Sequence, residues 1–124
     1  MNTPKISIAL ATYNGSDFLE QQVESYYSQQ FDEWRVLARD DHSQDNSFTL
    51  LQGLFENQDR IQFVGTELKN QGVTRNFGIL LEEALAAGHD YIALSDQDDV
   101  WNQDKLSEQL SLMRALEKLH PEFP

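Results

Sequence analysis

The sequence predicts an α/β domain in which an open, mostly parallel sheet is flanked by helices on both faces. Short apolar runs rich in β-branched residues alternate with longer stretches in which apolar residues recur with helical period, giving the order βαβαβαβα. Strands separated by single helices require right-handed crossovers, which make the strands parallel and cover both faces of the sheet. The length of 124 residues suits one domain, and we treat residues 1–124 as that domain.

Four segments have the composition and length of strands: residues 6–12, 34–39, 61–64 and 91–95. Apolar side chains fall on one helical face in the four stretches that follow them. These faces consist of Leu19, Val23, Tyr26 and Tyr27; Phe48, Leu51 and Leu54; Phe77, Leu80, Leu81, Ala84 and Leu85; and Leu106, Leu110, Met113 and Leu116.

Residues typical of helix ends agree with this assignment. Asp17 with Glu20 three residues later resembles a capping box at the first helix. Asp45 is expected to cap the second helix and Asn102 the fourth, and Gly88 to close the third. The fourth helix is followed by HPEFP and by no further strand, so we expect the domain to lack its C-terminal part.

Composition excludes several classes of function. A formal net charge of −12 with only nine basic residues argues against a nucleic-acid surface, which needs accumulated Lys and Arg. Cysteine is absent, so disulfides, thiolate metal sites and a Cys nucleophile are excluded. The N-terminus lacks the pattern of a signal peptide, and no apolar run approaches the roughly 20 residues of a spanning helix. We therefore expect a cytoplasmic domain without a transmembrane segment.

Polar residues collect where three of the predicted strands end. The first strand ends in ATYNG (11–15), the second in DDHSQDNS (40–47) and the fourth in SDQDDVW (95–101). In open parallel sheets, ligands bind in the crevice outside the carboxyl ends of the strands. We therefore expect the functional site at this edge.

The segment SDQDDVW crowds three carboxylates into four residues, and like charges this close repel one another. In extended backbone Asp96 and Asp98 face the same way while Asp99 faces elsewhere, and such a pair suits Mg²⁺ or Mn²⁺. A zinc site is not expected, because Cys is absent and His42 is isolated. The alternative is a solvated turn in which Asp99 and Asn102 cap the next helix.

Other residues near this edge have both a functional and a structural interpretation. Asp40 and Asp41 end the second strand, where one can accept a hydrogen bond from a ligand N–H and the other can brace the loop. Tyr13 offers a flat face for a base, or is simply packed. Arg75, after NQGVT (70–74), can meet a diphosphate, or is a cation on a helix surface.

The four motifs ALATYNG, RDDHSQDNS, NQGVTRNFG and SDQDDVW, in this order and at these distances, resemble the nucleotide-sugar-binding half of a family 2 glycosyltransferase with the GT-A fold. The resemblance covers nearly the whole chain. The form DQDDVW is most similar to bacterial rhamnosyltransferase-like members that build surface polysaccharides. Many relatives have Pro where Ala11 stands.

The resemblance implies a role for individual residues. Tyr13 stacks near the base, Asp41 hydrogen-bonds the pyrimidine, Asp98 binds the metal, and Asp96 lies nearer the ribose or sugar and shares the metal. The donor-binding set implied is Ala11, Thr12, Tyr13, Asp40, Asp41, Arg75 and Asp96.

The resemblance also implies an inverting, Mn²⁺- or Mg²⁺-dependent transfer from a dTDP- or UDP-sugar, such as one of rhamnose, to a saccharide or lipid-linked saccharide acceptor. The catalytic general base is expected beyond residue 124, so this chain alone should bind donor only. Two other interpretations stay open: a non-catalytic binding module of the same fold, and a Mg²⁺-dependent phosphoacceptor signalling domain, which has fewer matching features. An exposed sheet edge also leads us to expect self-association.

Overall fold

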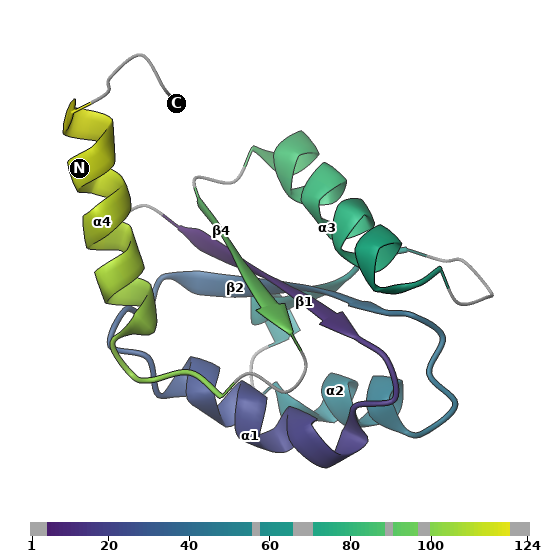
Figure 1. Cartoon of the computed structure of the whole chain (residues 1–124). Coiled ribbons are helices and arrows are strands. Elements are labelled where there is room, and N and C mark those ends of the chain that lie inside the picture. The colour runs from purple at the N-terminus through teal and green to yellow at the C-terminus, as the bar shows by residue number, and fades with distance from the viewer. Residues whose placement is uncertain (1–4, 56–57, 66–70, 89–90, 97–99, 120–124) are drawn as a thin grey trace.

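The structure is a computed structural model and describes residues 5–55, 58–65, 71–88, 91–96 and 100–119 (Figure 1). The predicted alternation of strands and helices is confirmed throughout these ranges.

The strands form one parallel sheet in the order β3-β2-β1-β4. Their bounds are β1 Ile6–Thr12, β2 Trp34–Asp40, β3 Ile61–Phe63 and β4 Tyr91–Asp96. All four predicted strands are present, with ends that differ by one residue or less from the expected ones. Every residue of β1 is buried, as expected of a central strand that is covered on both faces.

The helices cover both faces of the sheet, as predicted. They are α1 (Ser16–Tyr27), α2 (Ser47–Leu54), α3 (Val73–Ala87) and α4 (Lys105–Leu119), and a 3₁₀ turn that the sequence did not predict, η1, spans Gln58–Arg60. Figure 1 shows α1 and α2 beneath the sheet, α3 on the opposite side, and α4 standing at the end where the strands begin.

Each face of the sheet has its own apolar layer. The larger layer joins α1, α2 and the start of α4 to the sheet, and its largest fully buried members include Ile8, Leu19 and Tyr26. The smaller layer joins α3 to the other face through Ala9, Ala11, Leu37, Leu80 and Ala84. The small alanines let α3 approach the strands closely.

The helix ends follow the predictions only in part. Gly88 ends α3 in the left-handed conformation, with φ 71°, as expected. The N-cap position of α2 is Asn46 and not Asp45 as predicted, although Asp45 Oδ1 accepts the N–H of Ser47, the first residue of α2, at 2.9 Å. The predicted capping box of Asp17 and Glu20 is wrong: α1 begins at Ser16 without a bond from a cap side chain of its own.

The predicted cap at Asn102 is also misplaced, because α4 begins three residues later at Lys105. The buried side chain of Gln29 at the end of α1 takes over this role. Its Oε1 accepts the N–H of Leu106 at 3.1 Å, and its Nε2 donates to the carbonyl of Asn102 at 2.6 Å. Long-range capping of this kind leaves no signal in the local sequence of α4.

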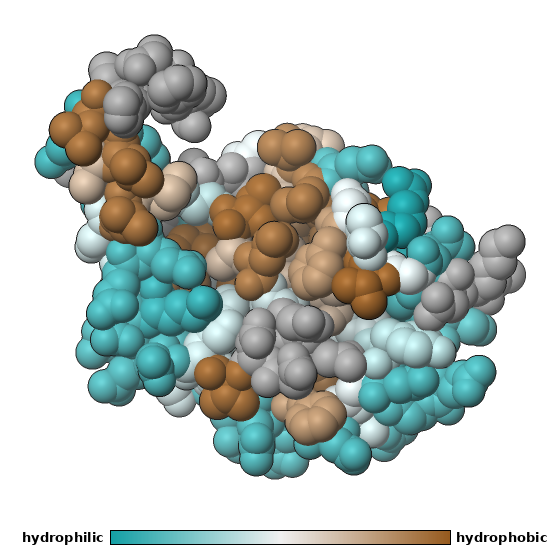
Figure 2. Space-filling view, in the orientation of Figure 1, coloured by the Kyte–Doolittle hydropathy of each residue, from teal (hydrophilic) through white to brown (hydrophobic). Residues whose placement is uncertain are grey.

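Apolar side chains gather over β4 and on the adjoining parts of α3 and α4 (Figure 2). A groove of about 270 Å³ lies there, lined in part by Ile6, Leu85, Tyr91 and Met113. Leu85 was expected on the buried face of α3, but 74% of its surface is exposed, so that prediction is wrong. Leu85 instead lines the groove beside β4, the edge strand of the described sheet.

Among the described residues, no helix combines the length and the apolar character needed to cross a bilayer.

Candidate functional site

The carboxyl ends of β1, β2 and β4 lie at the same edge of the sheet, as the sequence predicted. The strands pair in parallel register, with Thr12 opposite Asp40 and Ala11 opposite Asp96. Ala11 and Thr12 are both buried, so their side chains lie beneath the surface at this edge. The described ends of these three strands, at Thr12, Asp40 and Asp96, are thereby brought together in space.

The loops that follow β1 and β2 are joined by a series of hydrogen bonds. Asn14 donates its N–H to Ser43 Oγ at 2.8 Å, and its own Oδ1 accepts the N–H of Gln44 at 2.8 Å. Gly15 N–H donates to Ser47 Oγ at 2.8 Å, and Ser16 N–H reaches Asp45 Oδ2 at 3.2 Å. These bonds explain why α1 needs no local cap, because side chains of the second loop take the N–H groups at its start.

Asp40 is half-buried and braces the loop around it. Its Oδ1 accepts hydrogen bonds from the hydroxyls of Thr12 at 2.7 Å and Ser43 at 2.6 Å, and its Oδ2 accepts the Ser43 N–H at 2.9 Å. The loop-bracing interpretation of Asp40 is therefore confirmed. The bond to Thr12 also gives that residue a defined position between the two strand ends.

Asp41 is buried and is bound on both carboxylate oxygens. Oδ1 accepts Arg39 Nη1 at 2.9 Å and the N–H of Gln71 at 2.8 Å, while Oδ2 accepts the N–H of Gly72 at 2.8 Å. Burial alone raises the pKa of Asp41, but the hydrogen bonds from Arg39, Gln71 and Gly72 outweigh it and hold the pKa below its usual range. Asp41 is thus an ionised acceptor that ties the chain before α3 to the end of β2.

Arg39 and Asn76 belong to the same network and were not singled out from the sequence. Arg39 Nη1 also donates to Asn76 Oδ1 at 2.9 Å, and Asn76 Nδ2 lies 3.5 Å from the carbonyl of Thr12. All three polar side chains, Arg39, Asp41 and Asn76, are about 98% buried. A charged residue directly after the three apolar residues Val36, Leu37 and Ala38 is the signal that could have found this network.

Tyr13 and Arg75 lie at the surface of the same region. The Tyr13 side chain is 38% exposed, and it follows β1 directly. Arg75 lies on the first turn of α3, where its side chain is 56% exposed and its Nη1 is 3.8 Å from Glu82 Oε1. Both side chains are accessible to a ligand, whereas a weak surface pair such as Arg75–Glu82 contributes little to stability.

The acidic motif lies mostly outside the described residues. Asp96 ends β4 and its backbone is placed, but Asp98 and Asp99 fall in 97–99, beyond what the structure describes. Within the described ranges, no group of three or more His, Asp or Glu side chains could hold a metal ion. The metal assignment to Asp96 and Asp98 therefore stays a prediction.

Ser95, the residue before Asp96, is hydrogen-bonded to two side chains of α1. Gln22 Nε2 donates to Ser95 Oγ at 2.6 Å, and the Tyr26 hydroxyl lies 2.6 Å from the same oxygen. All three side chains are fully buried. The Tyr26 ring also lies 5.0 Å from the ring of Trp101. Tyr26 of α1 therefore contacts both Ser95, which precedes the acidic residues, and Trp101, which follows them.

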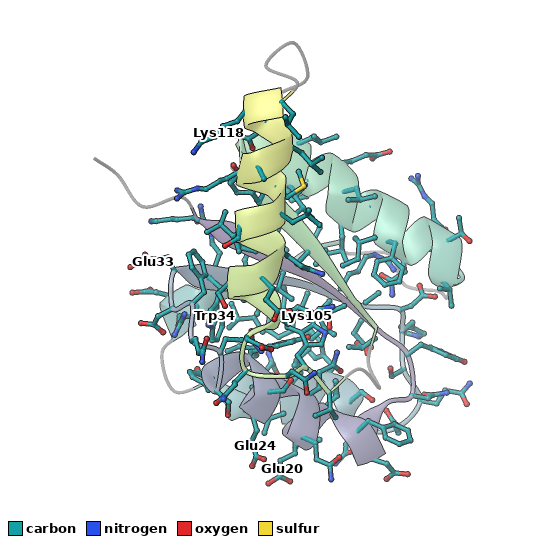
Figure 3. All side chains as sticks on the ribbon, turned by 60° about the vertical axis from the view of Figure 1, so that its left-hand side comes forward. Glu20, Glu24, Glu33, Trp34, Lys105 and Lys118 are labelled. Atoms are coloured by element: carbon teal, nitrogen blue, oxygen red, sulfur yellow. The ribbon has the colours of Figure 1, made fainter. Side chains whose placement is uncertain are left out.

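The chain after the acidic motif leads to a polar groove of about 420 Å³ beside the start of α4, lined in part by Val100, Trp101 and Lys105. Lys105 Nζ lies 5.1 Å from the centre of the Trp101 ring, a cation–π contact that covers one face of this buried indole. Figure 3 shows Lys105 at the base of α4, and Glu20 and Glu24 projecting from the outer face of α1.

The sequence model described as "Glycosyl transferase family 2" matches residues 7–120. The chain belongs to this family. A Bacillus subtilis (strain 168) glycosyltransferase whose name assigns it to teichuronic acid biosynthesis is 34% identical over 110 residues, which are 89% of this chain and 42% of that protein. The dTDP-rhamnosyl transferase RfbG of Shigella flexneri is 32% identical over 98 residues, 78% of this chain and 34% of its own length. This chain therefore spans less than half the length of these family 2 relatives.

Solved structures of the family's fold agree with the observed architecture. Staphylococcus aureus TarS 1–349 in complex with UDP-GlcNAc superposes with a TM-score of 0.77 at 21% identity, covering 90% of this chain and 31% of that one. The mannosyltransferase PcManGT from Pyrobaculum calidifontis, in complex with GDP-Man and Mn²⁺, gives a TM-score of 0.72 at 22% identity, covering 88% and 32%. The fold of this family 2 chain is therefore of the GT-A type.

Proposed function

We propose that this chain forms the donor site of a glycosyltransferase that transfers a sugar from a nucleoside diphosphate to a saccharide acceptor. The observation that carries the proposal is the convergence of the β1, β2 and β4 ends at one edge of the sheet. Parallel α/β sheets bind ligands at this edge. Two solved structures of the same fold contain nucleotide sugars, UDP-GlcNAc in one and GDP-Man in the other.

The described residues suit a nucleotide in three ways. The exposed ring of Tyr13 offers a face for stacking against a base, and we assign the buried, ionised Asp41 as the acceptor for a base N–H. Arg75 adds the cationic charge that a diphosphate requires, from an exposed position on the first turn of α3. A base that presents an N–H to the Asp41 carboxylate, as uracil and thymine do, favours UDP- or dTDP-sugars as donors.

The residues of the acidic motif fit a divalent cation by their chemistry. Asp96 and Asp98 supply two hard carboxylate oxygens, the ligand type that Mg²⁺ and Mn²⁺ prefer, and water and diphosphate oxygens can complete the coordination. Mn²⁺ accompanies GDP-Man in the structure of PcManGT. When bound, such an ion supplies Lewis-acid stabilisation for the charge on a departing diphosphate.

The acceptor site and the general base are assigned to the part of the relatives' length that this chain does not span. General-base help contributes roughly a hundred- to ten-thousand-fold to such a reaction, so we expect this chain alone to bind donor without efficient transfer. The relatives named for teichuronic acid synthesis and rhamnosyl transfer favour a saccharide or lipid-linked saccharide acceptor in bacterial surface polysaccharide synthesis.

Nucleotide binding by an Asp98→Ala variant tests the proposal. We expect the metal-dependent part of UDP or dTDP affinity to be lost while the thermal unfolding temperature changes by no more than about 2 °C. Asp59→Ala removes the same charge from the exposed turn η1 and serves as the control. Unchanged metal-dependent affinity in Asp98→Ala would contradict the metal assignment.

A further inference from the structure

Arg39 occupies a position where stability alone favours an apolar residue. It is 2% exposed, and Val36, Leu37 and Ala38 directly before it in β2 are apolar and buried. Burying a guanidinium costs free energy even when it is paired, and apolar residues of similar volume often replace buried ion pairs without loss of stability. A buried Arg at the ligand-binding end of the sheet therefore points to a role in the site.

The contacts of Arg39 connect three elements that border the site. One guanidinium nitrogen donates to Asp41 Oδ1 and to Asn76 Oδ1, both at 2.9 Å. Asp41 in turn accepts the N–H groups of Gln71 and Gly72 and donates its own N–H to the carbonyl of Thr12 at 2.8 Å. The ends of β1 and β2 and the start of α3 are thereby held in one arrangement.

We propose that Arg39 is a positioning residue of the donor site, which fixes the Asp41 carboxylate as a base acceptor and ties the first turn of α3, with Arg75, to the ends of β1 and β2. The inference rests on the proposed function, because it assigns Asp41 and Arg75 to the nucleotide. It also accounts for two motif residues that the donor assignment left without a role, Arg39 before DDHS and Asn76 within TRNFG.

The charged groups around Asp41 determine how the loss of Arg39 changes the pKa of the Asp41 carboxyl. Among the described groups, Arg39 is the charged partner in contact with Asp41, while Asp40 and His42 are its neighbours along the chain and Arg75 lies on the facing turn of α3. Burial raises the pKa of the Asp41 carboxyl, and the guanidinium offsets this effect. Without Arg39 the carboxyl should take up a proton at higher pH, and a protonated Asp41 is a poorer acceptor for a base N–H.

Titration of the chain with UDP and dTDP in the presence of Mg²⁺, between pH 5.5 and 8.5, tests the inference. We expect Arg39→Met to bind about tenfold more weakly than wild type, as when a charge-assisted hydrogen bond is weakened, and the loss of affinity to be largest at the acid end of this pH range. Arg35→Met removes the same side chain from the amino end of the same strand, and it should follow the wild-type profile.

The double variant Arg39→Met/Asp41→Asn removes both buried charges and should therefore fold even if Arg39→Met does not. It should bind weakly at every pH. An Arg39→Met profile parallel to that of Arg35→Met, or double-variant affinity equal to wild type, would overturn the inference. Absence of nucleotide binding by the wild-type chain would instead contradict the proposed function.

Discussion

The hydroxyl groups of Tyr26 and Ser95 lie 2.6 Å apart in the buried layer between α1 and β4, one residue before Asp96. Tyr26→Phe keeps the ring contacts with Trp34 and Trp101 but removes this hydroxyl. We expect unfolding in urea to show a loss of about 1 kcal/mol, the usual contribution of one buried hydrogen bond.

Tyr27→Phe is the matched control, because the neighbouring Tyr27 ring contacts Trp34 but is 37% exposed. It should change the free energy of unfolding by less than about 0.5 kcal/mol. Equal effects of the two substitutions would show that the Tyr26 hydroxyl contributes nothing specific to the anchoring of β4.

Asp41 should make the free energy of unfolding of this chain depend on pH in the acid range. Its pKa in the folded state is lowered from the ordinary value of 3.8, so its contribution is present above that value and is lost as the pH falls through the lower folded pKa. Urea unfolding between pH 2 and 7 should show wild-type stability falling below about pH 4.

The Asp41→Asn variant should lose about 3 kcal/mol at pH 7, because it removes the carboxylate that neutralises the buried Arg39. Its stability should also fall less steeply below pH 4. Asp45 contributes to the wild-type slope in the same direction, because its bonds to Ser47 and Ser16 outweigh the effect of burial and lower its pKa. A slope for Asp41→Asn as steep as that of wild type would exclude Asp41 as a source of the pH dependence.

Asn14 combines a left-handed backbone conformation with a side chain that bonds the second loop, and these two properties can be separated. Its φ is 50°, in the left-handed region, and its Oδ1 accepts the N–H of Gln44. Asn14→Gly loses the acceptor but tolerates this φ, whereas Asn14→Ala loses the acceptor and adds strain of about 1 kcal/mol. Thermal unfolding should therefore rank wild type above Asn14→Gly and Asn14→Gly above Asn14→Ala. Equal stability of the two variants would contradict the assigned conformation.

The apolar groove beside β4 should promote self-association of this chain. Leu85 and Met113 are 74% and 41% exposed there, at the edge of the described sheet. Size-exclusion chromatography with light scattering should give a mass that rises with concentration, and Leu85→Lys should return it toward 14.3 kDa. Val73→Lys, a charge added to an exposed position at the other end of α3, should leave the association unchanged. A mass of one chain at every concentration would count against this prediction.

The fold was predictable because its signals are local. The strands alternate with amphipathic helices, and the polar motifs follow the strands directly, so the topology and the edge that carries the site followed from the chain order. The unpredicted features depend on contacts between distant residues. Gln29 caps α4 from the loop after α1, and the start of α1 is capped from the loop after β2, so neither cap has a signature in its own helix.

The site was predicted at the level of motifs but not of contacts. Asp41 was identified from DDHS, yet its partners Gln71 and Gly72 lie about thirty residues away, and Arg39 was assigned only to the strand. A buried ion pair depends on which strand face a helix covers, and that is known only once α3 is placed. The carboxylate pair Asp96 and Asp98 stays a prediction, because 97–99 lies outside the described residues.

The most direct test of the donor-site assignment is isothermal titration calorimetry of this chain with nucleoside diphosphates and their sugars, with Mn²⁺ and again with a chelator. The account predicts binding that requires the metal and that is confined to uridine and thymidine diphosphates. Binding of adenosine and uridine diphosphates with equal affinity, or affinity unchanged by the chelator, would contradict it.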